Sequence, residues 1–366
     1  ISTKKIKYMK VGIITFHNGS NYGAVLQSFA LQEAEKKLGN EVFLINYDNR
    51  FISKGLDRVR FGFSILGLYS CFIDLLNYKS NRRKIEKFKE FFRNYYSLTH
   101  LMNTDALKTT NIYFDLGISG SDQIWNPLLN KKVDDIYYLN FGKFRYKISY
   151  ASSLGNYKFD SESFNDLIKR NLQSYLKIST RENSAKLERL IGKKVFNVCD
   201  PTLLLSKEEW ANRLGINENI SPYILVYSLT DSDNVIKIAH LIAKKKNLKI
   251  INIGKTIYHY NDVRCVLDAG PKEFVELFYN ASYVVTNSFH GTAFSINFKK
   301  QFLSVKHPKS PERAEHILSV TGLLSRLVSP QIIEFPNDME EGLINDTTKT
   351  LEKIRAESYQ FLKEGI

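Results

Sequence analysis

The sequence predicts an α/β protein of two domains, each built on a doubly wound parallel sheet. Apolar stretches of strand length alternate with amphipathic stretches of helix length along most of the chain, and this alternation is typical of parallel sheets. The chain has 366 residues, 43% of them hydrophobic, which is enough to fill two cores of ordinary size. This composition excludes disordered and fibrous architectures.

The first domain is expected to cover residues 1–215. Residues 10–46 open it with a buried strand, a loop rich in Gly and Asn, an amphipathic helix that stops at Gly39, and a second strand, which together form a βαβ unit. Residues 51–98 interrupt the alternation, and we interpret them as a helical insertion. Strand and turn patterns resume between residues 111 and 205 and complete the domain.

The second domain is expected to cover residues 216–340, where strands and helices alternate again. Residues 341–366 are expected to form a C-terminal helix that packs back on the first domain. The predicted architecture is two Rossmann-like domains facing across a cleft. In sheets of this kind ligands bind beyond the carboxyl ends of the strands, so the loops that follow strands are the places to search for chemistry.

The charge and cysteine content limit the partners. A net charge of +14 favours anionic partners such as phosphorylated metabolites, phospholipid headgroups or nucleic acid. No nucleic-acid recognition motif is visible, so we do not expect nucleic acid to be a partner. The cysteines, Cys71, Cys199 and Cys265, have neither disulfide nor zinc spacing, which predicts a reducing, cytoplasmic location and no metal.

The relation to the membrane is a second expectation. The longest apolar run, residues 63–76, is shorter than the roughly 20 residues of a spanning helix and contains Asp74. The segment 79–93 alternates Lys and Arg with Phe, which predicts a peripheral contact with the inner face of the membrane. The alternative, a solvated helix that packs its Phe residues on the protein, is equally open.

Polar residues in the first two strand-end loops predict a site for a sugar acceptor. The loops are "HNGSNYG" at 17–23 and "GSDQIWNP" at 120–127. Carboxylate, amide and indole groups together are typical of sugar sites. The alternatives are an ordinary tight turn for the first loop, and a helix cap with a core tryptophan for the second. The candidate acceptor-binding residues are His17, Asn18, Asn21, Tyr22, Gln123, Trp125 and Asn126, with Asp122 as a candidate general acid or base.

Two later loops carry groups that suit an anion. Arg181 in "STREN" can present a guanidinium to a carboxylate or phosphate with Glu182 orienting it, although a structural ion pair explains the same residues. His290 stands where the strand "YVVTNS" turns into a helix, so helix dipole, free amides and a titratable imidazole meet there. An isolated histidine is more often structural. The candidate anion-binding residues are Arg181, Asn287, Ser288, Gly291, Thr292 and Arg313.

Six motifs occur in a recognisable order: "ITFHNGSNYGAVLQSFALQ", "GSDQIWN", "YASSLG", "STREN", "CDPTLLL" and "TNSFHGTAFSINF". In this order they resemble the polysaccharide pyruvyl transferase family over roughly residues 10–330. The resemblance implies a glycosyltransferase B-like fold. It also implies transfer of pyruvate from phosphoenolpyruvate, a co-substrate, onto two hydroxyls of one sugar, which forms a cyclic ketal. The acceptor would belong to a surface polysaccharide, such as a capsule or exopolysaccharide, or to its lipid-linked oligosaccharide precursor.

The resemblance also assigns roles to residues. It makes His290 the family's histidine before the final helix and Arg181 its donor-binding arginine. For proton transfer we expect His290, assisted by Asp122 or Glu182. One departure stands out, because well-known members carry Arg two residues before the histidine, where this chain has Ser288. Arg313 or Lys306 would then supply the missing charge.

Two other functions fit the same residues. A nucleotide-sugar glycosyltransferase would use the same fold and the same phosphate site at a helix start. A non-catalytic glycan-binding protein would hold a sugar without turnover, although the density of polar residues on the strand-end loops argues against it.

Overall fold

A computed structural model describes residues 8–53, 77–182, 184–219, 221–230, 232–254, 258, 260–308, 311–331 and 343–364. The chain forms two compact units. The first unit comprises Ile1–Asp57, Phe92–Leu204 and Ala356–Ile366, and the second comprises Arg58–Phe91 and Leu205–Arg355. The boundary at Leu204 differs from the expected one at residue 215. The expected insertion 51–98 is divided between the two units, and its residues 54–76 lie outside the described residues.

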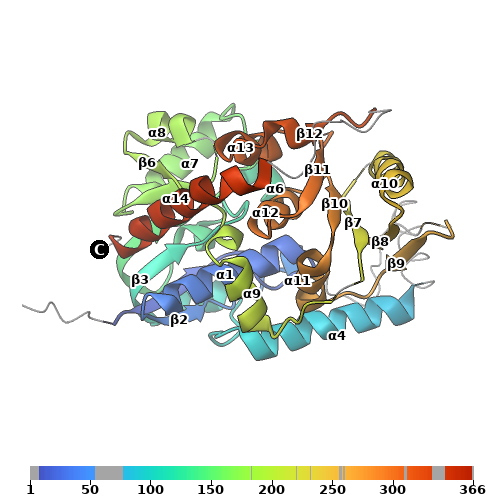
Figure 1. The fold of residues 1–366 in the computed structure, drawn as a ribbon. Coiled ribbons are helices and arrows are strands. Elements are labelled where there is room, and N and C mark those ends of the chain that lie inside the picture. Colours follow the sequence, from blue (N-terminus) through green and yellow to red (C-terminus); the bar gives the residue numbers. More distant parts are fainter. Residues whose placement is uncertain are drawn as a thin grey trace, which may run out of the picture. The chain divides into compact units, whose positions relative to one another are not determined.

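The first unit is built on a parallel sheet with strand order β2-β1-β3-β4 (Figure 1). The strands are β1 (Lys10–Ile14), β2 (Glu41–Leu44), β3 (Tyr113–Ser119) and β4 (Lys143–Ser149). A short parallel ladder of β5 (Ile178–Thr180) and β6 (Val195–Asn197) continues it through isolated bridges from β4 and the loop after it. The carboxyl ends of these strands therefore lie along one edge.

Helices of the first unit connect the strands. They are α1 (Tyr22–Lys37), α2 (Arg50–Ser53), α5 (Thr104–Thr109), α6 (Pro127–Asn130), η2 (Asp135–Tyr138), α7 (Glu162–Leu172), α8 (Ser184–Ile191) and η3 (Pro201–Leu203). Most of α1 is buried, because it packs on the sheet and on η3. Asn21 caps its start by accepting from the Gly23 and Ala24 amides at 2.9 and 3.3 Å.

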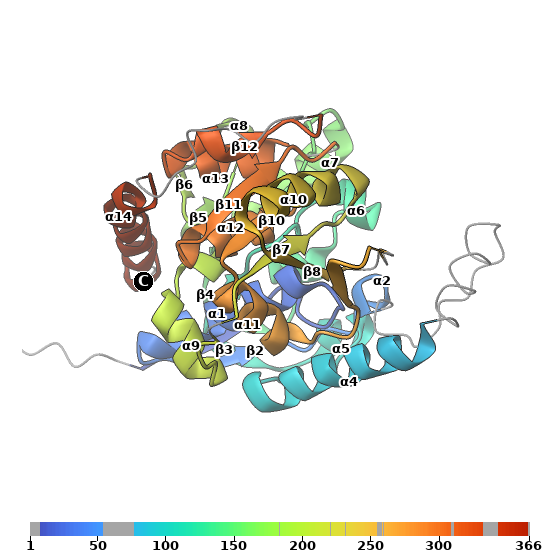
Figure 2. The same cartoon turned by 45° about the vertical axis from the view of Figure 1, so that its right-hand side comes forward.

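The second unit has a six-stranded parallel sheet in the order β12-β11-β10-β7-β8-β9 (Figure 2). The strands are β7 (Tyr223–Tyr227), β8 (Lys249–Ile253), β9 (Val263–Val266), β10 (Tyr283–Thr286), β11 (Gln301–Val305) and β12 (Leu327–Val328). The chain runs outward from β7 to β9, returns to β10 beside β7, and then runs the other way. The point between β7 and β10 is a topological switch point, where such sheets bind ligands.

Helices of the second unit are α9 (Lys207–Leu214), α10 (Ser232–Lys246), α11 (Pro271–Asn280), α12 (Phe289–Asn297), α13 (Glu312–Val320) and η4 (Leu324–Arg326). Both units therefore alternate strands with helices around a parallel sheet. The prediction of two Rossmann-like α/β domains is confirmed at this level.

Helix α4 (Tyr78–Tyr95) tests the expected membrane contact. Its apolar residues Ile85, Phe88 and Phe91 are buried, so they pack inside the protein and are not available to lipid. Two of its basic residues pair within the second unit, since Arg83 contacts Asp268 at 2.6 Å and Lys87 contacts Glu273 at 2.8 Å. This packing favours the alternative interpretation, a solvated helix that packs its Phe residues on the protein.

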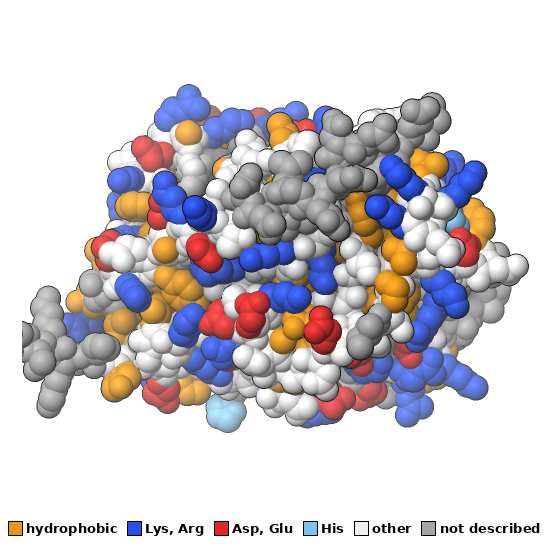
Figure 3. Space-filling view, in the orientation of Figure 1, with side chains coloured by type: hydrophobic (Ala, Val, Ile, Leu, Met, Phe, Trp, Pro, Cys, Tyr) orange, Lys and Arg blue, Asp and Glu red, His pale blue; other side chains and the backbone are white. Residues whose placement is uncertain are grey.

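The outward face of α4 also carries both signs of charge. Exposed Glu86 and Glu90 lie among Lys79, Arg82 and Lys89, which weakens attraction to an anionic surface. Basic and acidic side chains are likewise interspersed on the face shown in Figure 3. Within the part of the chain that the structure describes, no helix combines the length and the apolar character that crossing a bilayer requires.

The C-terminal helix α14 (Leu343–Lys363) contacts the first unit through its last turns. The Cys199 amide donates to the Ser358 hydroxyl at 3.0 Å. The Phe361 ring packs on Tyr150 and Phe196, with centroid distances of 6.3 and 5.4 Å. Ser358 therefore holds the backbone immediately before Asp200.

Glu35 in α1 is a buried acid in the first unit. Its side chain accepts a hydrogen bond from Asn40 at 2.7 Å, while Oε1 has no partner among the described residues. Burial raises the pKa of Glu35 to about 7, and the bond from Asn40 offsets only part of the effect. Because the folded-state pKa lies above the ordinary 4.5, the stability linked to this group is fully present below pH 4.5 and declines up to about pH 7.

We expect Glu35→Gln to remove this pH dependence. Between pH 5 and 8 the free energy of unfolding of the wild type should fall by about 2 kcal/mol relative to the variant, because ionising a buried acid costs about 1.4 kcal/mol per pKa unit. Urea unfolding at both pH values measures it, with the exposed Glu41→Gln as control. Parallel pH profiles of wild type and Glu35→Gln would contradict the account.

Candidate functional site

Four loops of the first unit meet at the carboxyl edge of its sheet. Isolated bridges join Asp122 to Ser152 and Ser152 to Thr180, so the loops after β3, β4 and β5 run side by side. Asp122 takes a left-handed conformation with φ 71°, which is uncommon outside glycine and turns the chain sharply after β3. Arg181 and Glu182 follow β5, and Asp200 follows β6.

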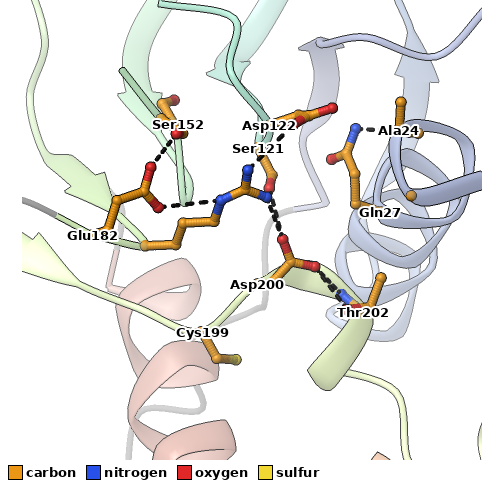
Figure 4. A network of polar contacts seen from close by, with 12 residues as sticks. Ala24, Gln27, Ser121, Asp122, Ser152, Glu182, Cys199, Asp200 and Thr202 are labelled. Carbon is orange, nitrogen blue, oxygen red and sulfur yellow. Dashed lines mark hydrogen bonds and ion pairs between the residues drawn. The ribbon is translucent and has the colours of Figure 1, made fainter. Parts of the chain in front are cut away.

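Arg181 lies at the centre of these loops, and its side chain is only 2% exposed. Its Nη1 donates to Asp200 at 2.6 Å, its Nη2 to Asp122 at 3.2 Å, and its Nε to Glu182 at 3.2 Å. Figure 4 shows the three carboxylates arranged around the guanidinium. We call Arg181, Asp122, Glu182 and Asp200 the Arg181 cluster.

Asp200 is the member of the Arg181 cluster that solvent does not reach. Its side chain is fully buried. Oδ1 accepts from the amide and the hydroxyl of Thr202 at 3.0 and 2.7 Å, and Oδ2 also accepts from Ser121 at 3.4 Å. Asp200 was not among the candidate site residues. Its sequence signal is "DPT" after a short strand, because Asp followed by Pro is typical of a helix start, and Asp200 does cap η3.

The cluster has an excess of negative charge. Burial alone lowers the pKa of Arg181, but Glu182, Asp200 and Asp122 outweigh that effect and hold it above its ordinary value. When all four groups are ionised, one positive charge faces three negative charges. A phosphate or carboxylate approaching Arg181 would be repelled by the carboxylates.

The donor-binding role expected for Arg181 is therefore not what its contacts show. Nε, Nη1 and Nη2 are all directed at acidic side chains of the same unit. The alternative, a structural ion pair, describes the contacts better, although Arg181 pairs with three carboxylates and not with one. Arg181 positions acidic side chains at the strand ends.

The carboxylates that remain partly exposed are Asp122 and Glu182. Their side chains are 12% and 11% exposed. Glu182 also accepts a hydrogen bond from the Ser153 hydroxyl, which in turn accepts from the Gly155 amide at 2.9 Å. Both carboxylates are thus fixed in position and still reachable, as a general acid or base must be.

The residues that follow Asp122 have structural partners. Trp125 belongs to the core with 2% exposure, stacks on Tyr138 at 5.3 Å and donates to the Tyr137 carbonyl at 3.2 Å. Asn126 caps α6 through the Leu128 amide at 3.1 Å and donates to Gln123 at 2.8 Å. This favours the helix cap and core tryptophan over a sugar platform, because no face of the indole is open in this structure.

The first loop is also internally satisfied. His17 is buried and contacts the Thr15 carbonyl through Nδ1 at 3.0 Å and Asn46 through Nε2 at 3.2 Å. Burial lowers its pKa, which favours the neutral ring, and a neutral ring can donate to only one of these two oxygens, the Thr15 carbonyl or Asn46 Oδ1. Asn18 donates to the Tyr47 carbonyl at 3.0 Å. With Tyr22 buried in α1 and Asn21 as its cap, the loop has the features of the tight turn.

In the second unit, hydrogen bonds join the ends of β7 and β10 at the switch point. The Thr286 hydroxyl donates to the Tyr227 carbonyl at 2.6 Å and accepts from the Ser288 amide at 3.1 Å. Asn287 accepts from the Leu229 amide at 3.0 Å and donates to the Thr230 carbonyl. Asn287 therefore fastens the loop after β7 to the loop after β10.

The start of α12 shows why small residues stand there. Ser288 is buried and caps the helix by accepting from the Gly291 amide at 3.4 Å, while Thr292 donates to the Ser288 carbonyl. A Cβ on Gly291 would lie 2.3 Å from the Thr286 hydroxyl, so only glycine permits this approach of helix and strand. Ser288, where the resemblance led us to expect arginine, serves here as a buried cap.

His290 and Arg313 lie on the same aromatic ring. The His290 ring, 8% exposed, meets Phe289 edge to face at 5.1 Å, and the Arg313 guanidinium lies 4.9 Å from the Phe289 centroid. Lys306, the other residue expected to supply charge, pairs with Glu315 at 3.4 Å. The sequence did not single out His307, which contacts the Thr230 hydroxyl at 2.9 Å; its only sequence signal is its place after strand β11.

The comparison with protein families identifies the chain. The model of the family described as polysaccharide pyruvyl transferase matches residues 21–308, more than half of the chain. The chain therefore belongs to this family, and it is a transferase of polysaccharide pyruvylation. The match includes the Arg181 cluster as well as the start of α12.

Solved structures resemble the chain in fold. UDP-GlcNAc 2-epimerase from Methanocaldococcus jannaschii has 12% identity and a TM-score of 0.48 over 94% of this chain and 92% of its own. The Neisseria meningitidis epimerase bound to UDP-GlcNAc has 10% identity and a TM-score of 0.48 over 98% and 99%. E. coli heptosyltransferase with ADP has 12% identity and a TM-score of 0.39 over 94% and 100%. No curated protein matches the chain in sequence.

Asn21 allows the cap and the acceptor-binding interpretation to be separated. We expect Asn21→Ala to lower the free energy of unfolding by about 1 kcal/mol, because the Gly23 and Ala24 amides lose their acceptor. Asn21→Ser should retain both the cap and the stability. Urea unfolding measures both variants. If Asn21→Ser is as stable as the wild type but no longer modifies its acceptor, Asn21 binds the acceptor after all.

Proposed function

We propose that the protein transfers pyruvate from phosphoenolpyruvate onto two hydroxyls of one sugar and forms a cyclic ketal during surface polysaccharide biosynthesis. The observation that carries the proposal is the family match over residues 21–308. The polar clusters at the strand ends of both units support it, because proton transfer and anion binding are the two requirements of this chemistry.

The donor is assigned to the second unit. Phosphoenolpyruvate carries a phosphate and a carboxylate, so its site needs cationic and amide donors. Arg313, His290 and the first amides of α12 are such groups, and they lie around Phe289. His290 is the proposed proton donor to the methylene carbon, and the family position of the histidine supports this choice. Arg181 is not included among the donor ligands, because carboxylates occupy its nitrogens.

The acceptor is assigned to the carboxylates of the first unit. A sugar hydroxyl becomes a better nucleophile as its proton is withdrawn, and Asp122 and Glu182 are fixed and reachable bases. The proposal includes a lipid-linked oligosaccharide as acceptor and phosphoenolpyruvate as co-substrate, with no cofactor.

The test is incubation of the protein with phosphoenolpyruvate and a panel of lipid-linked glycans, with phosphate release and acceptor mass measured together. We expect phosphate release and an acceptor mass increased by pyruvate less one water. A hexose-sized increase with a nucleotide sugar would instead identify a glycosyltransferase. Glycan binding without turnover on any donor would identify a binding protein.

His290→Gln provides the matched variant for this assay. Because general acid catalysis contributes about 100-fold or more, its turnover should fall by at least about 100-fold. His100→Gln, at an exposed position of the first unit, is the control and should retain full turnover. A folded His290→Gln protein with near wild-type turnover would remove His290 from the mechanism.

A further inference from the structure

We propose that Asp122 and Glu182 act as a pair, in which each carboxylate accepts the proton of one of the two acceptor hydroxyls. The inference rests on the proposed function and specifies its acceptor, a sugar diol whose two hydroxyls lie close enough to close one ring. In this scheme each of the two residues accepts one proton, whereas a single general base would have to accept both protons in turn.

The first support is the geometry of the guanidinium. Nε–H and one N–H of Nη2 point the same way from one edge of the guanidinium plane, whereas Nη1 lies at its other end. Glu182 accepts from Nε and Asp122 accepts from Nη2, both at 3.2 Å, so two of the three nitrogens of one guanidinium hold the two carboxylates. Asp200 occupies Nη1 at 2.6 Å. Two carboxylates held by one guanidinium match two hydroxyls of one sugar.

The second support is access. The side chains of Asp122 and Glu182 are 12% and 11% exposed, whereas the side chain of Asp200 is 0% exposed. Asp200 is also saturated by Thr202 and Ser121. Asp200 is therefore a positioning residue that anchors Arg181, and only the other two carboxylates can touch a substrate.

The third support is the excess of oxygen acceptors at this edge, which includes a buried acceptor outside the cluster. The Gln27 amide nitrogen donates to the Thr15 hydroxyl at 3.0 Å and to the Phe16 and Ala24 carbonyls at 3.1 and 2.8 Å, which fixes the amide. Its oxygen, on a side chain with 0% exposure, has no partner among the described residues.

Figure 4 shows the Gln27 side chain directed toward the strand ends that carry Ser121 and Asp122. Oxygen acceptors thus outnumber donors at this edge, where Arg181 is the only cation of the cluster. The acceptors that a ligand can reach are the oxygens of Asp122 and Glu182, and they suit a ligand that brings O–H donors, such as a sugar.

The reaction balances with two bases. In the first step the methylene carbon gains a proton, one hydroxyl oxygen bonds to the central carbon, and the first carboxylate takes that hydroxyl's proton. In the second step the bond to the phosphate oxygen breaks, phosphate leaves with the electron pair, and the second hydroxyl oxygen bonds to the same carbon. The second carboxylate takes that proton. Of the two protons removed, one balances the new methyl group and the other leaves with hydrogen phosphate.

The test compares Asp122→Asn and Glu182→Gln in the full-length protein, with ketal and phosphate measured in each reaction. The wild type should form one ketal per phosphate. One variant should lose both products by about 100-fold, because the first addition fails. The other should still release phosphate but yield free pyruvate, because water captures the central carbon when the second hydroxyl stays unactivated. Asp166→Asn, an exposed carboxylate of the same unit, should behave as the wild type.

Acceptors that lack one hydroxyl provide a second measurement that does not depend on the variants folding. With the wild type, a deoxy acceptor that lacks the second hydroxyl should release phosphate without ketal. The variant that fails at ring closure should give the same products with this deoxy acceptor as with the complete acceptor, namely phosphate without ketal. Equal loss of ketal and phosphate in both variants, or ketal formation from an acceptor with one hydroxyl, would overturn the pair. A wild type that forms no ketal from phosphoenolpyruvate would overturn the proposed function itself, and the pair with it.

Discussion

The ion pairs between Arg181 and three carboxylates are the interaction on which the rest of the first unit's site depends. Buried carboxylates repel one another, so Asp122, Glu182 and Asp200 can share this edge only because a guanidinium lies between them. The guanidinium in turn fixes the loops after β3, β5 and β6. Arg181 is therefore best understood as the residue that assembles the acidic site, and the proposed function assigns the donor's negative charge to the second unit.

In the second unit, a different kind of interaction holds the strand-end loops in place. Its switch point is held by neutral hydrogen bonds, in which Asn287 and the Thr286 hydroxyl join the loops after β7 and β10. Gly291 lets α12 approach the strand, and Ser288 caps it. None of these hydrogen bonds involves a carboxylate. This contrast in charge, acidic in one unit and neutral to basic in the other, is what supports assigning the acceptor and the donor separately.

The alternation of strands and helices was sufficient to predict two parallel α/β sheets and the loops that hold the polar clusters, because burial periodicity is a local property. Single residues were harder to predict. Trp125 suited a sugar site by composition, but its burial against Tyr138 depends on the tertiary fold. Asp200 was missed because Arg181 and Ser121 lie 19 and 79 residues away from it along the chain. Gln27 was missed because only the folded structure shows that its oxygen is buried without a partner among the described residues. Arg181 was singled out from the sequence, but the three carboxylates that converge on its guanidinium could not be counted from the sequence.

A double-mutant cycle between Arg181 and Asp200 tests most directly whether the cluster is one cooperative unit. Arg181→Met, Asp200→Asn and the double variant are unfolded in urea in a Trp210→Phe background, so that fluorescence reports Trp125 in the first unit. We predict a coupling energy of about 2 kcal/mol, with the double variant more stable than the sum of the single effects implies. Additivity within about 0.5 kcal/mol would show that the two residues act independently and would contradict the account.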